Sequence, residues 1–219
     1  MHDIILFDLD GTLTFSEEGI TNCVKYALES FALHETDRKK LLLFIGPPLK
    51  DCFMELYGFD EEKADAAVEK YRERYSAKGY LENELVAGTD DLLKKLKNDG
   101  YTIVLATSKP INFSLKILEF FDILKYFDEC VGAELHGGIN EKKDIIAEVI
   151  RRLGEDKKPR MIMVGDRKMD ILGAKENGIK SIGVRYGYAP DGELEAAGAD
   201  YIADTTEDIG KIVYGLKER

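Results

Sequence analysis

Short apolar runs alternate with amphipathic segments through most of the chain, a pattern typical of an α/β domain. Ile4 to Phe7 form a continuous apolar run, as expected for a strand buried on both faces of a parallel sheet. Further strands are predicted at 101–106, 129–132, 160–164, 181–184 and 201–202, with helical segments between them. We therefore expect a Rossmann-like α/β core of three layers, in which a parallel sheet lies between helices.

A different pattern interrupts this alternation directly after the first strand. From residue 15 to residue 85, apolar residues recur at helical spacing and no strand signal separates them. Ser16 is a candidate N-cap for the first of these helices, and Gly46-Pro47-Pro48 breaks the block near its middle. We expect two domains: a core formed by residues 1–14 and 86–219, and an inserted helical bundle formed by residues 15–85.

Two acidic residues come immediately after the first strand. Asp8 and Asp10 are two residues apart, so on extended backbone their side chains lie on the same side of the chain, and Gly11 permits a sharp turn. Like charges at this separation are costly unless a cation or a proton lies between them. The pair predicts a metal site that contains a reactive carboxylate.

Polar residues also end two later strands of the predicted sheet. Thr107 and Ser108 follow one strand, and Asp166 ends another within Gly165-Asp166-Arg167-Lys168-Met169-Asp170. All strands of a parallel sheet end at one edge, where ligands bind, so these residues should meet Asp8 there. Asp166 and Asp170 have the i to i+4 spacing of one helical face, and one of them can bind a metal while the other braces the loop. Oxygen ligands without Cys or His favour Mg²⁺.

The motif Asp8-Leu9-Asp10-Gly11-Thr12, together with the later Asp166 motif, resembles the haloacid dehalogenase superfamily. The resemblance extends over essentially the whole chain. Within the superfamily, the chain is similar to the phosphoglycolate phosphatase and 5'-nucleotidase-like branch. It implies a phosphatase in which Asp8 is the nucleophile, Asp10 is the general acid and base, and Thr12 fixes the loop. It also implies that Mg²⁺ is bound by Asp8, the backbone carbonyl of Asp10, and Asp166.

The same resemblance implies the residues that contact the phosphoryl group. Thr107 is expected to donate its hydroxyl hydrogen bond to the phosphoryl oxygens, with Ser108 beside it. A lysine must balance the charge of the nucleophile and the phosphate, and 140–146 offers two at a helix start. The pattern favours Lys142 over Lys143, and both are kept as candidates.

The inserted helices resemble the cap domain of such phosphatases, with hinges near residues 14–17 and 81–87. A cap of this kind closes over the site and excludes water. The segment Phe44-Ile45-Gly46-Pro47-Pro48-Leu49 resembles a cap loop of the same branch, and Lys50 beside it is a candidate contact for an anionic substrate.

The charge balance limits the partners that the protein can bind. The formal net charge of -11 argues against nucleic acid polymers and anionic membranes. The expected partner is a small phosphate ester, and a monomer and a homodimer are both open. The first strand begins at once, with no basic leader and no long apolar segment, so we expect a cytoplasmic location.

Two other functions share these features. A phosphomutase of the β-phosphoglucomutase type would have every core residue named above. A receiver-like signalling module also gathers acids, a hydroxyl group and a lysine at strand ends. It is disfavoured because its phosphoacceptor follows a middle strand and no helical insert follows its first strand. The favoured prediction is a Mg²⁺-dependent phosphomonoesterase.

Overall fold

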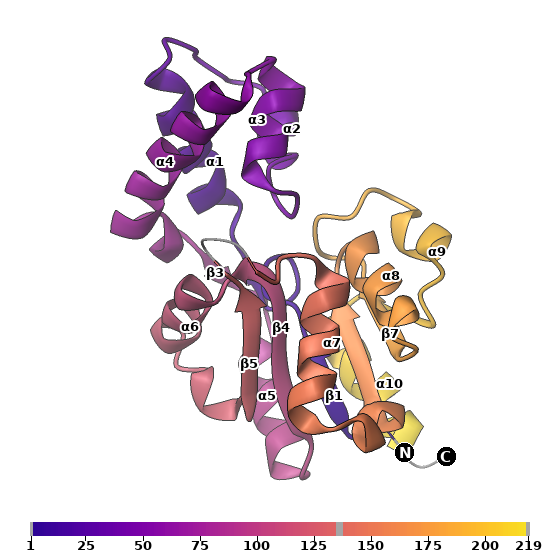
Figure 1. The fold of residues 1–219 in the computed structure, drawn as a ribbon. Coiled ribbons are helices and arrows are strands. Elements are labelled where there is room, and N and C mark those ends of the chain that lie inside the picture. The colour runs from indigo at the N-terminus through magenta and orange to yellow at the C-terminus, as the bar shows by residue number, and fades with distance from the viewer. Residues whose placement is uncertain (1, 135–137, 218–219) are drawn as a thin grey trace. The chain divides into compact units, whose positions relative to one another are not determined.

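Six parallel strands form one sheet in the order β5-β4-β1-β6-β7-β8 (Figure 1). The predicted Rossmann-like parallel sheet is therefore confirmed. The strands are β1 (Ile4–Phe7), β4 (Thr102–Pro110), β5 (Glu129–Ala133), β6 (Met161–Gly165), β7 (Lys180–Val184) and β8 (Tyr201–Ala203). The first strand lies between β4 and β6, so the residues that follow it are at the centre of the sheet edge.

The computed structural model describes residues 2–134 and 138–217, which belong to two units. The sheet unit contains the chain up to Thr14 and from Leu85 onward, and the helical unit contains Phe15–Glu84. Two short strands, β2 (Thr14–Phe15) and β3 (Glu84–Leu85), pair with each other where the chain passes between the units. The candidate chemistry is concentrated in the sheet unit, so this unit is the frame of the site.

Alternate side chains of a strand point to opposite faces of the sheet, and in β1 the side chains on both faces are buried. Ile4 and Leu6 of β1 belong to a core cluster with α7 and α8, and the intervening Ile5 and Phe7 are equally buried. This burial on both faces explains why β1 is a continuous apolar run. The helices of the sheet unit are α5 (Thr89–Asn98), α6 (Ile111–Phe120), α7 (Lys142–Leu153), α8 (Lys168–Glu176), α9 (Glu193–Ala197) and α10 (Thr206–Lys217).

One strand of the sheet is longer than the sequence predicts. We expected it to end at residue 106, but β4 continues through Pro110 after a shift in its register with β5. A shift of this kind changes the direction in which the following side chains point. It affects Ser108 and Lys109, which follow Thr107 at the functional edge.

The helical unit contains α1 (Glu17–Glu29), α2 (Arg38–Leu42), α3 (Leu49–Tyr57) and α4 (Glu61–Ala77). Helices α1 and α4 pack together, and edge-to-face aromatic contacts join Phe44 to Phe53 and Phe31 to Phe59. Ser16 stands at the N-cap of α1, but its side chain makes no capping hydrogen bond, so the expected cap is wrong in this detail. Over the described part of the chain, every helix is too short or too polar to cross a membrane.

Candidate active site

Three neighbouring strands bring the predicted acidic and hydroxyl residues to one edge of the sheet. Asp8 follows β1, Asp166 follows β6, and Thr107 lies in β4. In the registers of the two strand pairs, Phe7 lies opposite Leu105 on one side and Val164 on the other. Residues more than 150 positions apart in the sequence therefore become neighbours because parallel strands end together.

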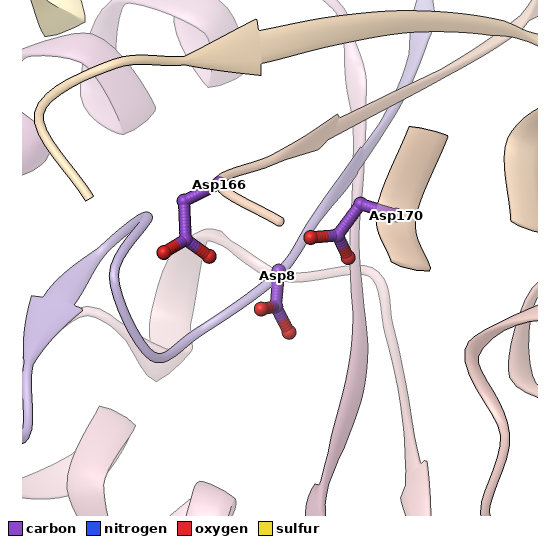
Figure 2. Close-up of side chains that lie close together, drawn as sticks. All are labelled: Asp8, Asp166 and Asp170. Carbon is purple, nitrogen blue, oxygen red and sulfur yellow. The ribbon is translucent and has the colours of Figure 1, made fainter. Parts of the chain in front are cut away.

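Asp8, Asp166 and Asp170 form a buried cluster at this edge. The three side chains lie close together (Figure 2), and one carboxylate oxygen of each lies within 4.8 Å of those of the other two. Asp170 lies in the first turn of α8, where its Oδ2 accepts a hydrogen bond of 3.0 Å from the backbone N–H of Arg167. This bond fixes the loop between β6 and α8, and with it the position of Asp166.

Lys142 holds this acidic cluster together at the N-terminus of α7. Its Nζ lies 2.6 Å from Asp8 Oδ1 and 2.8 Å from Asp170 Oδ1, and it donates a hydrogen bond to the carbonyl of Ala106 at 3.0 Å. The side chain is only 4% exposed. Burial alone would lower the pKa of Lys142, but the charges of Asp170 and Asp8 outweigh it and raise that pKa.

Burial changes the proton affinity of two carboxylates in the cluster. It raises the pKa of Asp8 to about 6, although Lys142 acts in the opposite direction. Burial, and then the charges of Asp170 and Asp8, raise the pKa of Asp166 well above its usual range. The cluster therefore carries more negative charge than its surroundings accommodate at neutral pH, a condition that a bound cation relieves.

The donor atoms of the cluster fit a hard divalent cation. Within the described ranges, Asp166 Oδ1 is buried without any hydrogen-bond partner. The other oxygen of this carboxylate, Oδ2, accepts a hydrogen bond of 2.7 Å from the backbone N–H of Tyr188. A buried acceptor without a partner costs free energy that a metal ligand bond would offset. Carboxylate oxygens without sulfur or imidazole suit Mg²⁺ better than zinc or copper.

Asp10 faces a different cation, Lys109, which the sequence analysis did not assign. The Nζ of Lys109 donates to both carboxylate oxygens of Asp10, at 2.8 and 3.0 Å. Lys109 is buried, and the backbone N–H of the same residue donates to Thr107 Oγ1 at 3.2 Å. A signal was present in the sequence, because a residue two positions after Thr107 shares its face if the strand continues.

The loop that carries Asp10 is fixed by its own backbone. Gly11 has φ +80°, the left-handed conformation that favours glycine, and its N–H donates to the carbonyl of Thr14 at 2.7 Å. Thr12 and Thr107 are almost completely buried, and Thr12 Oγ1 has no hydrogen-bond partner in the described part of the chain. Ser108, the next residue of β4, is half-buried.

A second loop, residues 185–188 after β7, braces the site and was not predicted. The hydroxyl of Tyr186 donates to the carbonyl of Thr12 at 2.9 Å, and the backbone N–H of Tyr188 donates to Asp166. A Cβ added to Gly187 would lie 2.3 Å from Asp166 Cβ and 2.5 Å from the carbonyl oxygen of Gly11. These contacts join distant segments, so no local pattern in the sequence indicates them.

The remaining two lysine candidates have other partners in the structure. Lys143 is half-exposed and pairs with Glu141 at 2.9 Å, so Lys142 is the lysine that contacts Asp8. Lys50 lies in α3 of the helical unit, where it pairs with Asp65 at 3.0 Å.

Known proteins resemble this chain in sequence and in fold. The sequence model of the family "haloacid dehalogenase-like hydrolase" matches residues 5–184. A 5'-nucleotidase of Pseudomonas aeruginosa is 44% identical over 192 residues, which are 88% of this chain and 86% of that protein. A phosphoglycolate phosphatase of Vibrio parahaemolyticus is 28% identical over 220 residues, covering 96% of this chain and 95% of that protein. The crystal structure of a predicted phosphatase from Clostridium acetobutylicum has a TM-score of 0.92 at 45% identity, covering 98% of this chain and 99% of that one.

Replacing Gly187 with alanine tests the close packing of the two loops. The new methyl group would meet Asp166 and the backbone of Gly11, and overpacking of this kind costs about 1–3 kcal/mol. We expect the midpoint of thermal unfolding to fall by roughly 2–10 °C. The control is Gly215→Ala in α10, where, apart from the neighbouring residues and the backbone of α10 itself, no atom of the described residues lies within 4 Å of the added Cβ. An unchanged midpoint for Gly187→Ala would contradict the packing described here.

Proposed function

The chain belongs to the haloacid dehalogenase-like hydrolase family and is a phosphatase of that type, and we propose that it hydrolyses a small phosphorylated metabolite through a phosphorylated Asp8. The candidate substrates are phosphoglycolate and a nucleoside 5'-monophosphate. The observation that supports the proposal best is the contact of Lys142 with Asp8 inside the acidic cluster. This contact puts a positive charge beside the proposed nucleophile, where it would also offset the charge of a bound phosphate.

The proposed reaction has two steps, and Asp8 and Asp10 have separate roles. In the first, a carboxylate oxygen of Asp8 attacks the phosphorus atom and the bond from phosphorus to the leaving oxygen breaks, while protonated Asp10 gives its proton to that oxygen. In the second, Asp10 takes a proton from water, the water oxygen attacks phosphorus, and the bond from phosphorus to Asp8 breaks. Inorganic phosphate leaves, and both residues return to their starting states.

We propose Mg²⁺ as the cofactor, held by Asp8 and Asp166, with the backbone carbonyl of Asp10 as a third ligand. The buried Asp166 Oδ1, which has no hydrogen-bond partner among the described residues, supports this assignment. Bound there, Mg²⁺ would offset the repulsion between the nucleophile and an anionic phosphate. Asp170 then has a bracing role, because it already accepts from the backbone of Arg167 and pairs with Lys142.

The choice of substrate class has two supports. Two relatives carry the names 5'-nucleotidase and phosphoglycolate phosphatase, and each aligns with most of this chain. The net charge of -11 also favours a small ester held at a local cationic site over a polyanion. We propose that the helical unit acts as a cap and that its side chains choose among these esters.

The first test is release of inorganic phosphate from phosphoglycolate, nucleoside monophosphates, sugar phosphates and an aryl phosphate. We expect release that requires Mg²⁺ and stops with chelator. Asp8→Asn should lower turnover by at least about a thousandfold, because the amide lacks the nucleophilic oxygen anion.

Two measurements complete this test. Circular dichroism must show that Asp8→Asn is folded, and a folded variant that keeps its activity would rule out a phosphorylated Asp8. Formation of a sugar bisphosphate with little free phosphate would instead identify a phosphomutase. Phosphorylation of Asp8 without release from any ester would indicate a signalling module.

Metal binding should depend on pH through Asp8. Its pKa is raised from 3.8 to about 6 in the folded protein, so in the absence of metal this group's contribution to stability falls as the pH rises between those values. Mg²⁺ competes with the proton for the carboxylate. We therefore expect Mg²⁺ to raise the midpoint of thermal unfolding clearly at pH 7.5 and much less at pH 5.

The matched control for this experiment is Asp166→Asn, which removes a proposed ligand charge and should abolish most of the increase at pH 7.5. Added NaCl of equal ionic strength separates metal binding from charge screening. An equal increase at both pH values would contradict the part assigned to Asp8, and no increase at either would contradict the metal site.

A further inference from the structure

Lys109 is buried at the active-site edge, and the reaction described above gives it no role. Its side chain is 6% exposed and that of Asp10 is 17% exposed, and the Nζ donates to both oxygens of Asp10. We propose that Lys109 is a positioning residue, which holds the Asp10 carboxyl group in the orientation from which it gives its proton to the leaving oxygen of the substrate. This inference rests on the proposed function, in which Asp10 gives the leaving oxygen its proton.

The backbone around Lys109 is arranged to place this side chain. The register of β4 shifts between Thr107 and Pro110, and the N–H of Lys109 is held by the hydroxyl group of Thr107. On the neighbouring β5, a Cβ at Gly132 would lie 2.8 Å from the carbonyl oxygen of Lys109 and 3.1 Å from the Cα of Ile111. The irregular part of β4 therefore packs directly against backbone, so the root of the Lys109 side chain has little freedom.

The two buried lysines of the site have different partners. Lys142 contacts Asp8 and Asp170, whereas Lys109 contacts Asp10. A single ammonium group that donates to both oxygens of a carboxylate restricts the rotation of that carboxylate, and hydrogen bonds to charged groups are the stronger kind. Asp10 stands on a loop rather than within a strand, so its side chain depends on such a contact for its orientation.

When the general acid is displaced, the reaction slows most for a leaving group that needs to be protonated as it departs. General acid catalysis contributes about 10²–10⁴ in rate, and a misplacement of about 1 Å can remove a factor of about 10². An alkoxide is a poor leaving group and needs protonation as it departs. A nitrophenolate is a stable anion and needs little help. Loss of a residue that positions Asp10 should therefore affect alkyl esters more than nitrophenyl esters.

The test compares two substrates in wild type and Lys109→Met. The substrates are p-nitrophenyl phosphate and the alkyl phosphate of the panel above that the wild type hydrolyses fastest. We measure kcat/KM, because it reports the steps up to departure of the leaving group. For Lys109→Met we expect kcat/KM to fall about 10- to 100-fold with the alkyl ester and less than about 5-fold with the nitrophenyl ester.

A double variant separates this role from a general structural effect. In an Asp10→Asn background the proton donor is absent, so Lys109→Met should cause no further change in the ratio of the two kcat/KM values. A change in this background as large as in the wild type would overturn the proposal. An equal loss for both esters in the single variant, or no loss for either, would also overturn it.

Two further variants keep the result interpretable. Lys109→Arg retains the charge and should give a ratio nearer to wild type than Lys109→Met does. If Lys109→Met does not fold, the same comparison is made with Lys109→Arg, whose displaced guanidinium should still cost the alkyl ester more than the aryl ester. The matched control is Lys97→Met, which removes a Lys–Asp pair with Asp128 elsewhere in the sheet unit and should leave the ratio unchanged.

The same assay distinguishes the failure of this inference from the failure of the proposed function. Phosphate release by the wild type, with equal losses in Lys109→Met for both esters, would overturn the positioning role alone. No release from any ester by the wild type would overturn the proposed function, and this inference with it.

Discussion

The structure of the site depends on one electrostatic constraint, the burial of carboxylates close to one another. Asp8, Asp166 and Asp170 lie within 4.8 Å, and Asp10 follows Asp8 by two residues. When all four are ionised, the ammonium groups of two buried lysines offset half of their charge. The remaining two negative charges equal the charge of one divalent cation. Burial raises the pKa of Asp8 to about 6, and the charges of Asp170 and Asp10 act in the same direction.

The two lysines reach the acids from different kinds of backbone. Lys142 begins helix α7, and its Nζ contacts Asp8, Asp170 and a carbonyl of β4, so one side chain joins α7, β1, α8 and β4. Lys109 reaches Asp10 from an irregular strand that packs against Gly132. Because Asp8 and Asp10 contact different lysines, a change at one lysine should disturb one part of the reaction more than the other.

The sequence predicted those parts of the site that depend on local pattern. Apolar runs located the central strands, and the rule that parallel strands end together placed Asp8 beside Asp166. The assignment of Lys109 was missed because the strand was expected to end at residue 106, and only pairing with β5 extends it. The contacts of Tyr186 with Thr12 and of Gly187 with Gly11 were missed because they join segments about 175 residues apart, which no local period encodes. Tertiary contact, not propensity, decides these features.

The surroundings of the two acids after β1 differ in a way that suits their proposed roles. Asp8 is enclosed by Lys142 and two further carboxylates, where a metal and the phosphate would meet. Asp10 is not part of that cluster among the described residues, and we propose that its side chain does not bind the metal and can exchange a proton with the leaving group and water. When two neighbouring carboxylates have different environments, one can act as a nucleophile and the other as an acid and base in the same site.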